Sequence, residues 1–99
     1  MSVLMTLRVT GDRAAIEASD QETLRKVGDR AKEFGCISHH FFGSDTEVFV
    51  VDEWPDEGSF QAFFAASPEI PEMMAAAGVT SQPTIEFWHP LDTGDSIGW

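Results

Sequence analysis

The sequence has no long apolar stretch, only one cysteine and few basic residues. No apolar run approaches the ~20 residues that a membrane-spanning helix needs, and the chain does not open with a signal-peptide pattern. We therefore expect a cytoplasmic protein without a membrane partner. Cys36 alone can form no internal disulfide and has no companions for a thiolate metal site, which fits a reducing compartment. We interpret it as a small buried apolar residue.

Basic residues are scarce relative to acidic ones. Six Lys and Arg stand against 17 Asp and Glu, which gives a net charge of −11. Such a chain repels phosphate backbones and anionic membranes, so nucleic acid is excluded as an expected partner. The acidity is interpreted as a solvated surface that keeps the protein in solution.

Alternating apolar residues predict four strands in a single domain, residues 1–99. Residues 3–10 alternate along their length, and 36–43 and 47–54 form a hairpin across a polar turn, Ser44 to Thr46. The last strand is predicted at 83–90, and an irregular C-terminal tail follows from about residue 91.

Helical spacing predicts two long helices and a short Ala-rich helical piece after residue 12. In the first long helix, Ser19 and Glu22 have the spacing of a capping box, and Gly35 marks the end. In the second, Asp56 is the expected N-cap, Ser67 and Pro68 restart the helix, and an apolar face of Phe and Met side chains continues to a glycine at 78.

The order β-α-β-β-α-β predicts a ferredoxin-like α+β fold, with a four-stranded antiparallel sheet and both helices on one face. The strand at 47–54 is apolar on both of its faces, from Val48 to Val51, which is typical of a strand covered on both sides. Two helices cover only one face of a sheet. We therefore expect a homodimer that stacks the two open sheet faces and encloses a cavity between them.

Three motifs in the same order carry a family resemblance: GCISHHFF at 35–42, VVDEWPD at 50–56 and FQAFFAASP at 60–68. With these, the chain resembles the antibiotic biosynthesis monooxygenase-like proteins of the dimeric α+β barrel superfamily, from about Val3 to His89. That superfamily includes cofactor-free quinol-forming oxygenases, haem-degrading enzymes and small-molecule isomerases. The resemblance implies the fold and the dimer, and it leaves the reaction open.

Some residues that the resemblance would lead one to expect are absent. The haem-degrading relatives have a Trp at the end of the corresponding strand, where Trp54 stands here, together with an Asn on the first strand and a His on the second helix. This chain contains no Asn, no Tyr and no His between Asp56 and Gly78. Haem degradation by that route is therefore the least favoured function, and no cofactor is expected.

His39 and His40 are the leading candidates for proton transfer, because imidazole titrates near neutral pH. Adjacent strand residues face opposite sides, so only one can point into a cavity, and the pattern of neighbouring residues favours His40. The alternative for either is a structural histidine. Their spacing with His89 provides no pair suited to a metal ion, so no metal site is expected.

Arg8 and Trp88 complete the candidate site. Arg8 lies on the polar side of the first strand, and Glu86 or Asp52 is its expected ion-pair partner. Trp88 shares a face with Glu86 and is expected either to wall the cavity or to pack in an interface. Trp54 is expected to stack on a flat aromatic ligand or, alternatively, to anchor the junction of strand and helix.

The leading hypothesis is a cofactor-independent monooxygenase that acts on a flat aromatic molecule such as a quinol or polyphenol. In this hypothesis His40 is the base, Arg8 the charge partner and Trp54 the stacking wall, with Trp88 and His39 as further substrate contacts. The alternative is a non-catalytic protein of the same fold that binds a small molecule or another protein.

Overall fold

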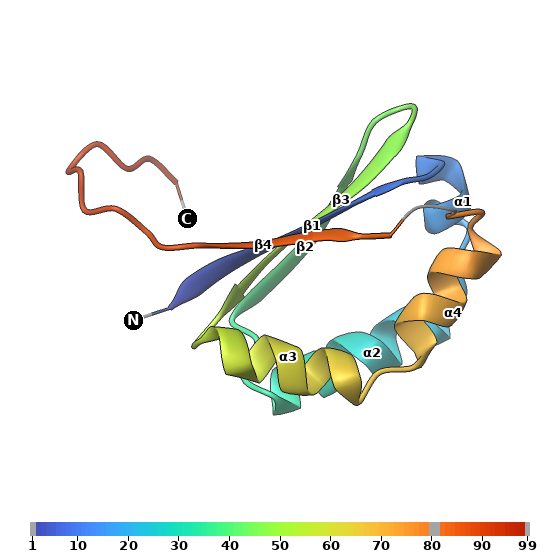
Figure 1. The fold of residues 1–99 in the computed structure, drawn as a ribbon, viewed down its shortest axis with the longest axis horizontal. Coiled ribbons are helices and arrows are strands. Elements are labelled where there is room, and N and C mark those ends of the chain that lie inside the picture. Colours follow the sequence, from blue (N-terminus) through green and yellow to red (C-terminus); the bar gives the residue numbers. More distant parts are fainter. Residues whose placement is uncertain (1, 80–81, 99) are drawn as a thin grey trace.

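The computed structural model describes residues 2–79 and 82–98. Its elements, in chain order, are β1 (Val3–Thr10), α1 (Arg13–Glu17), α2 (Gln21–Glu33), β2 (Ser38–Gly43), β3 (Glu47–Trp54), α3 (Glu57–Ala65), α4 (Glu69–Ala76) and β4 (Thr84–Trp88). The four strands form one antiparallel sheet in the order β2-β3-β1-β4, and the helices lie together on one side of it (Figure 1). The predicted ferredoxin-like α+β fold is confirmed.

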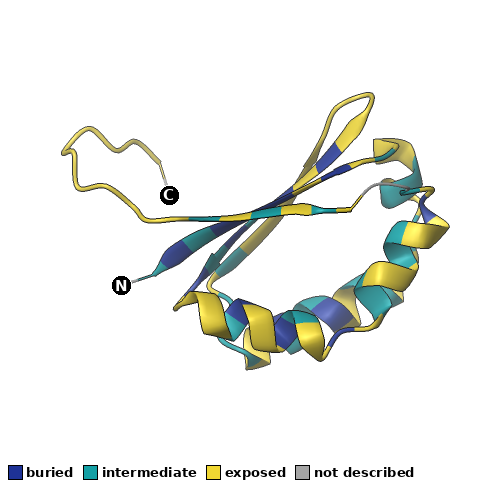
Figure 2. Ribbon diagram, in the orientation of Figure 1, coloured by how far each residue is buried: buried dark blue, intermediate teal, exposed yellow. Residues whose placement is uncertain are grey.

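The core lies between the helices and the side of the sheet that they cover. Alternate residues of β1 and β3 point to this side, and the helices contribute apolar side chains from the opposite layer, so burial is concentrated at the contact between the two layers (Figure 2). The buried hydrophobic residues are Val3, Met5, Leu7, Val9, Val27, Ala31, Val48, Val50, Trp54, Phe60, Phe63 and Ala77.

The start of α2 differs from the predicted capping box. Asp20, not Ser19, is the N-cap, and its carboxylate accepts a hydrogen bond from the backbone N–H of Glu22. The Ser19 hydroxyl instead donates to the carbonyl of Ala15, one turn back. An aspartate satisfies the first free N–H groups of the helix as well as a serine does, and its charge suits the helix N-terminus. Gly35, with φ at +99°, ends the helix as predicted.

The helical region after β3 is split into α3 and α4. Asp56 caps α3 as predicted, since its carboxylate accepts from the backbone N–H of Ser59. The prediction for Ser67 was wrong: Pro68 is the N-cap of α4, and the Ser67 hydroxyl donates to the carbonyl of Phe63. A buried hydroxyl in this corner is satisfied by the end of α3, not by the start of α4.

Both outer strands of the sheet are shorter than predicted. β2 begins at Ser38 and β4 covers only Thr84–Trp88. Residues 89–98 contain no helix or strand, and this segment runs from β4 away from the body of the molecule (Figure 1). In the part of the chain that the structure describes, no helix has the length and apolarity needed to cross a bilayer.

The side of the sheet without helices is called the open face here. The strand register places these residues on it: Leu4, Thr6, Arg8, His40, Phe42, Phe49, Val51, Thr84, Glu86 and Trp88. Phe42, Phe49 and Trp88 are 50%, 36% and 49% exposed in the single chain. Phe42 and Phe49 are paired directly across β2 and β3, and Trp88 lies opposite Leu4 of β1. Large exposed aromatic side chains on one face of a sheet are typical of a surface that contacts another molecule.

Candidate active site

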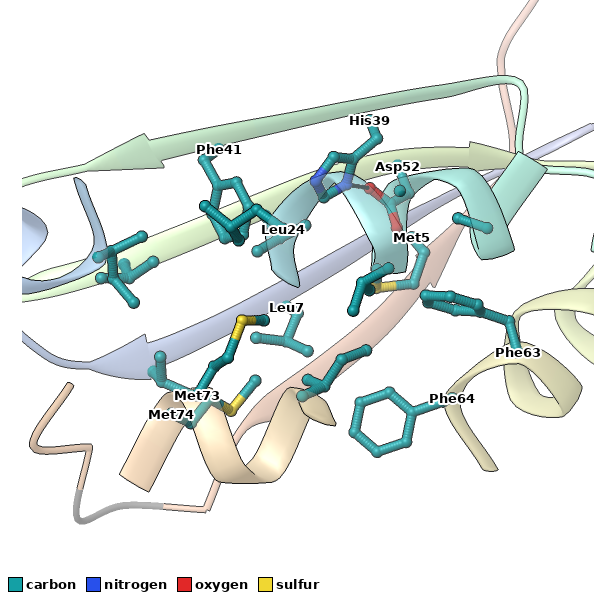
Figure 3. Close-up of a pocket in the computed structure, with 18 of the residues that line it drawn as sticks. Met5, Leu7, Leu24, His39, Phe41, Asp52, Phe63, Phe64, Met73 and Met74 are labelled. Carbon is teal, nitrogen blue, oxygen red and sulfur yellow. Dashed lines mark hydrogen bonds and ion pairs between the residues drawn. The ribbon is translucent and has the colours of Figure 1, made fainter. Parts of the chain in front are cut away.

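A cavity lies between the helix-covered side of the sheet and the helices (Figure 3). Its volume is about 90 Å³, counted as the space in which the centre of a water molecule can move. Three lining side chains are polar, Ser19, His39 and Asp52, and the rest of the wall is apolar. The apolar part consists of Met5, Leu7, Val9, Ile16, Leu24, Val27, Gly28, Ala31, Phe41, Val48, Val50, Phe60, Phe63, Phe64, Ile70, Met73 and Met74.

The polar corner of the cavity is a chain of two hydrogen bonds through Asp52. His39 Nδ1 lies 2.6 Å from Asp52 Oδ1, and the indole Nε1–H of Trp54 donates to Asp52 Oδ2 over 3.1 Å. Because the carboxylate only accepts, Nδ1 of His39 carries the proton and donates it to Asp52. The other ring nitrogen, Nε2, is then the acceptor, and it lies on the side of the ring toward Phe41 and Leu24 (Figure 3).

The three residues differ sharply in exposure. The side chain of His39 is 42% exposed and that of Asp52 only 5%, while Trp54 is fully buried at 0%. The imidazole of His39 is therefore accessible to solvent at the cavity wall, and the almost buried carboxylate of Asp52 lies behind it. A carboxylate that is almost buried requires hydrogen-bond donors, and the imidazole and the indole supply them.

Cys36 lies next to this corner and is only partly buried, in contrast to the buried position expected from sequence. Burial, and secondly the negative charge of Asp52, raise the pKa of its thiol to about 11. Its sulfur also contacts the carbonyl of Ser38 at 3.2 Å. The thiol is thus held in its neutral form and is a poor nucleophile.

The hairpin turn explains why His39, and not the predicted His40, faces the cavity. Ser44 N–H donates to Glu47 O over 2.9 Å, so the turn has two central residues and Gly43 pairs with Val48. Counting back along the ladder pairs His39 with Asp52 and His40 with Val51. A turn of three residues would shift the register by one and place the opposite histidine on this side.

Trp54 points to the same side of the sheet as Val48, Val50 and Asp52. It does not wall the cavity. Its ring packs on Phe60 and Phe63, with centroids 5.7 and 5.3 Å away. In this structure the indole anchors the junction of strand and helix and holds Asp52, and the stacking contact with a ligand expected from sequence is not available to a side chain with no exposed surface.

Arg8 and Trp88 lie on the open face, away from the cavity. Arg8 Nε pairs with Glu47 Oε2 at 3.3 Å, and not with the predicted Glu86 or Asp52. Glu47 lies on the same face of the sheet, two residues before Phe49, which is directly across from Arg8, whereas Asp52 points to the other face. The indole N–H of Trp88 donates to Thr6 Oγ1 over 2.9 Å. The structure therefore divides the predicted site: His39 and Trp54 meet through Asp52, while Arg8, His40 and Trp88 stand on the opposite side of the sheet.

The cavity itself is also in a different place from the one predicted. It is formed within one chain, between sheet and helices, and not between two open sheet faces. Sequence analysis named Asp52 only as a partner for Arg8. Its signal was present, because a carboxylate that alternates with Val48 and Val50 on a buried strand face requires a buried partner.

Within residues 2–79 and 82–98, no three His, Cys, Asp or Glu side chains come close enough together to hold a metal ion. The polar corner offers one imidazole and one carboxylate. This arrangement can accept a proton from a molecule in the cavity and stabilise the resulting imidazolium, which is the role of a general base oriented by a carboxylate.

Comparison with known proteins places the fold. No protein-family model matches the sequence, and no curated protein sequence is significantly similar to it. Solved structures are similar: SnoaB from Streptomyces nogalater, a cofactor-independent oxygenase, has a TM-score of 0.65 at 17% identity over 96% of this chain and 98% of its own. The monooxygenase ActVA-Orf6 of Streptomyces coelicolor, in complex with nanaomycin D, has a TM-score of 0.68 at 16% identity over 93% and 89%.

A third structure, an antibiotic biosynthesis monooxygenase, has a TM-score of 0.60 at 11% identity over 92% of this chain and 99% of its own. The chain has the fold of the antibiotic biosynthesis monooxygenases. The antibiotic biosynthesis monooxygenase fold confirms the architecture that the resemblance of the three sequence motifs implied. Because the identities are between 11% and 17%, the similarity establishes the fold and the chemistry has to be argued from the chain's own residues.

Proposed function

We propose that the protein is a cofactor-independent monooxygenase that oxidises a small aromatic molecule in the cavity between sheet and helices. The observation that carries this proposal is the hydrogen-bonded pair of His39 and Asp52, because His39 is the one basic group among the residues that line the cavity. The oxygenase named among the structural neighbours supports the same class of reaction.

His39 is the proposed base. With Nδ1–H engaged by Asp52, Nε2 accepts the proton of a ring hydroxyl, and the imidazolium that forms lies between two negative charges, the substrate anion and Asp52. The apolar wall shelters that anion from bulk water, which keeps it electron-rich. His39 thus takes the role that sequence analysis gave to His40.

The anion then reacts with molecular oxygen. It gives one electron to O₂, and the two radicals combine at a ring carbon. One oxygen atom enters the ring as a quinone carbonyl, and the other leaves as water with the two hydrogens that the substrate loses. The reaction is balanced without an external reductant, and the protein's part is to remove the proton and to hold the ring.

Asp52 is a positioning residue, and Trp54 determines what happens when it is changed. In Asp52→Asn, the amide oxygen must face the Trp54 N–H, so the amide nitrogen faces His39 Nδ1. The amide nitrogen only donates, so His39 Nδ1 has to accept. This moves the ring proton to Nε2 and removes the base from the cavity. In the double variant Asp52→Asn with Trp54→Phe the amide can turn round, and part of the rate should return.

Oxygen uptake with a panel of phenols and quinols tests these roles. We expect His39→Gln to lower kcat by about 100-fold or more, with a smaller change in KM, since a positioned general base contributes about 10²- to 10⁴-fold. His40→Gln, the matched variant on the open face, should retain activity. Loss of activity in His40→Gln with a normal rate in His39→Gln would contradict the assignment.

A second candidate function is favoured by the size of the cavity. Its 90 Å³ is smaller than the ~150 Å³ of an engineered cavity that holds benzene, so the wall must yield before a ring can enter. A protein that only binds a small apolar molecule would need no more than this. If the protein binds a small apolar molecule without taking up oxygen, and if His39→Gln binds it with the same affinity, the binding function would be established instead.

We also propose a homodimer formed through the open face. This face presents partly exposed Phe42, Phe49 and Trp88, and in an isologous dimer the same face of a second copy would cover them. The cavity is complete in one chain, so in this proposal the dimer covers the sheet and leaves the site of chemistry within each protomer.

A further inference from the structure

The charge distribution around the cavity indicates which molecules it accepts. All six Lys and Arg of the chain are among the described residues, and none of them lines the cavity. The single formal charge in the wall is the carboxylate of Asp52, and the hydroxyl of Ser19 is engaged with the carbonyl of Ala15 at 3.4 Å. We propose that the cavity takes an uncharged aromatic molecule with one acidic hydroxyl, and that Asp52 rejects molecules that carry a carboxylate. The inference rests on the proposed function, because it assigns the substrate class of the same site.

The exclusion of carboxylates follows from desolvation and from repulsion. A ligand carboxylate would lose its hydration among Met, Phe and Leu side chains and gain no cation in return. It would also meet Asp52, whose side chain is only 5% exposed, so that water screens the repulsion poorly. The uncharged ester or alkyl analogue of the same ring meets neither cost.

The preference for a single hydroxyl follows from the polar corner. His39 offers one acceptor, Nε2, because Nδ1 is engaged by Asp52. A second hydroxyl at the far end of a ring would be buried against Met73 and Met74, whose thioether sulfurs are only weak acceptors (Figure 3). An unpaired buried hydroxyl lowers affinity by the cost of its lost hydration.

The ring must displace side chains to enter, and the wall is suited to this. Met5, on the sheet, and Met73 and Met74, on α4, line the cavity, and methionine adapts to an incoming group more readily than a branched residue does. We therefore expect single-ring molecules to bind more tightly than larger ring systems. A substituent para to the hydroxyl should point toward α4.

The experiment compares two probes that differ in one charge: 3-(4-hydroxyphenyl)propanoate and its methyl ester. Their dissociation constants are measured by calorimetry without turnover, so the result does not depend on oxygenase activity. We expect the ester to bind at least tenfold more tightly than the acid in wild type. Repeating the measurement at high salt distinguishes two sources of repulsion against the acid. Salt screens repulsion from the acidic protein surface, whereas repulsion from the nearly buried Asp52 remains.

Two variants assign the effect to the polar corner. Asp52→Asn, which removes the charge, should strengthen binding of the acid and thereby narrow the difference between acid and ester to a few-fold. His39→Gln, which keeps the charge, should weaken the ester and leave the acid weak. If a variant does not fold, the ratio of the dissociation constants of acid and ester in wild type still tests the proposed preference. An acid that binds as tightly as the ester, an ester that does not bind, or a ratio unchanged in folded Asp52→Asn would overturn the inference.

Failure of the inference and failure of the proposed function give different results. Tight binding of the acid with oxygen uptake would overturn the substrate class and leave the monooxygenase. If the ester binds selectively but no phenol supports oxygen uptake, the inferred preference for uncharged ligands would stand and the proposed monooxygenase function would be wrong.

Discussion

Two tryptophans make similar hydrogen bonds in different surroundings. Trp54 donates to Asp52 inside the core, and Trp88 donates to Thr6 on the open face, where its own ring is 49% exposed. Water can replace the bond that Trp88 makes. It cannot reach the buried oxygen of Asp52 that Trp54 satisfies, so the same chemical change at the two positions should have unequal costs.

We expect Trp54→Phe to lower the free energy of unfolding by about 2–4 kcal/mol, because it leaves a buried carboxylate oxygen without its donor and a gap beside the smaller ring. Trp88→Phe should cost less than about 0.5 kcal/mol, as surface substitutions commonly do. Urea unfolding measures both. The comparison is made in a Phe49→Glu background, in which we expect a monomer, so that dimer dissociation does not enter. Equal costs would contradict the role assigned to Trp54.

Polar contacts attach the N-terminal end of α4 to α2. None of the residues of α4 is buried, and its N-cap, Pro68, makes no side-chain capping bond. Arg30 of α2 holds this end of the helix: its two terminal guanidinium nitrogens donate to the carboxylate oxygens of Glu69, over 2.7 and 2.8 Å. One of them, Nη1, also donates to Ala66 O over 3.3 Å. Since α4 contributes Met73 to the cavity wall, this attachment links α2 to an element of that wall.

The attachment should weaken in acid. The hydrogen bonds from Arg30 lower the pKa of Glu69 from 4.5 to about 2 in the folded protein. A lowered folded pKa contributes stability that is complete above pH 4.5 and is lost as pH falls toward 2. We therefore expect Glu69→Gln to be less stable than wild type at pH 6, with the difference shrinking between pH 4.5 and 2.

Urea midpoints across this pH range measure the difference, and Glu72→Gln on the same helix controls for the loss of one negative charge. Subtraction removes the contributions of the capping residues Asp20 and Asp56, which both variants share. A Glu69→Gln midpoint that stays a constant distance below wild type down to pH 2 would show that the ion pair does not titrate as proposed.

For the whole molecule, periodicity was sufficient to predict the fold. The alternation in residues 3–10 and the hairpin pattern around the turn Ser44 to Thr46 predicted the two central strands, 3–10 and 47–54, with their observed bounds. The site could not be predicted in the same way, because it depends on how two strands pair. One residue more or less in the turn at 44–47 exchanges His39 for His40, and the sequence of the turn, Ser-Asp-Thr-Glu, contains no glycine to specify its type.

The open face bears on whether the protein is a monomer or a dimer. Phe49 lies on it between Arg8 and Phe42 in the strand register. We expect wild type to be a dimer at micromolar concentration by native mass spectrometry, and Phe49→Glu to be a folded monomer, because a carboxylate facing its own symmetry copy in an apolar interface loses hydration and meets a like charge. Gln61→Glu, on the exposed side of α3, adds the same charge elsewhere and should remain a dimer. A wild-type monomer, or a dimer that persists in Phe49→Glu, would show that a second copy does not cover this face, and the half-exposed aromatic residues would then require a different partner.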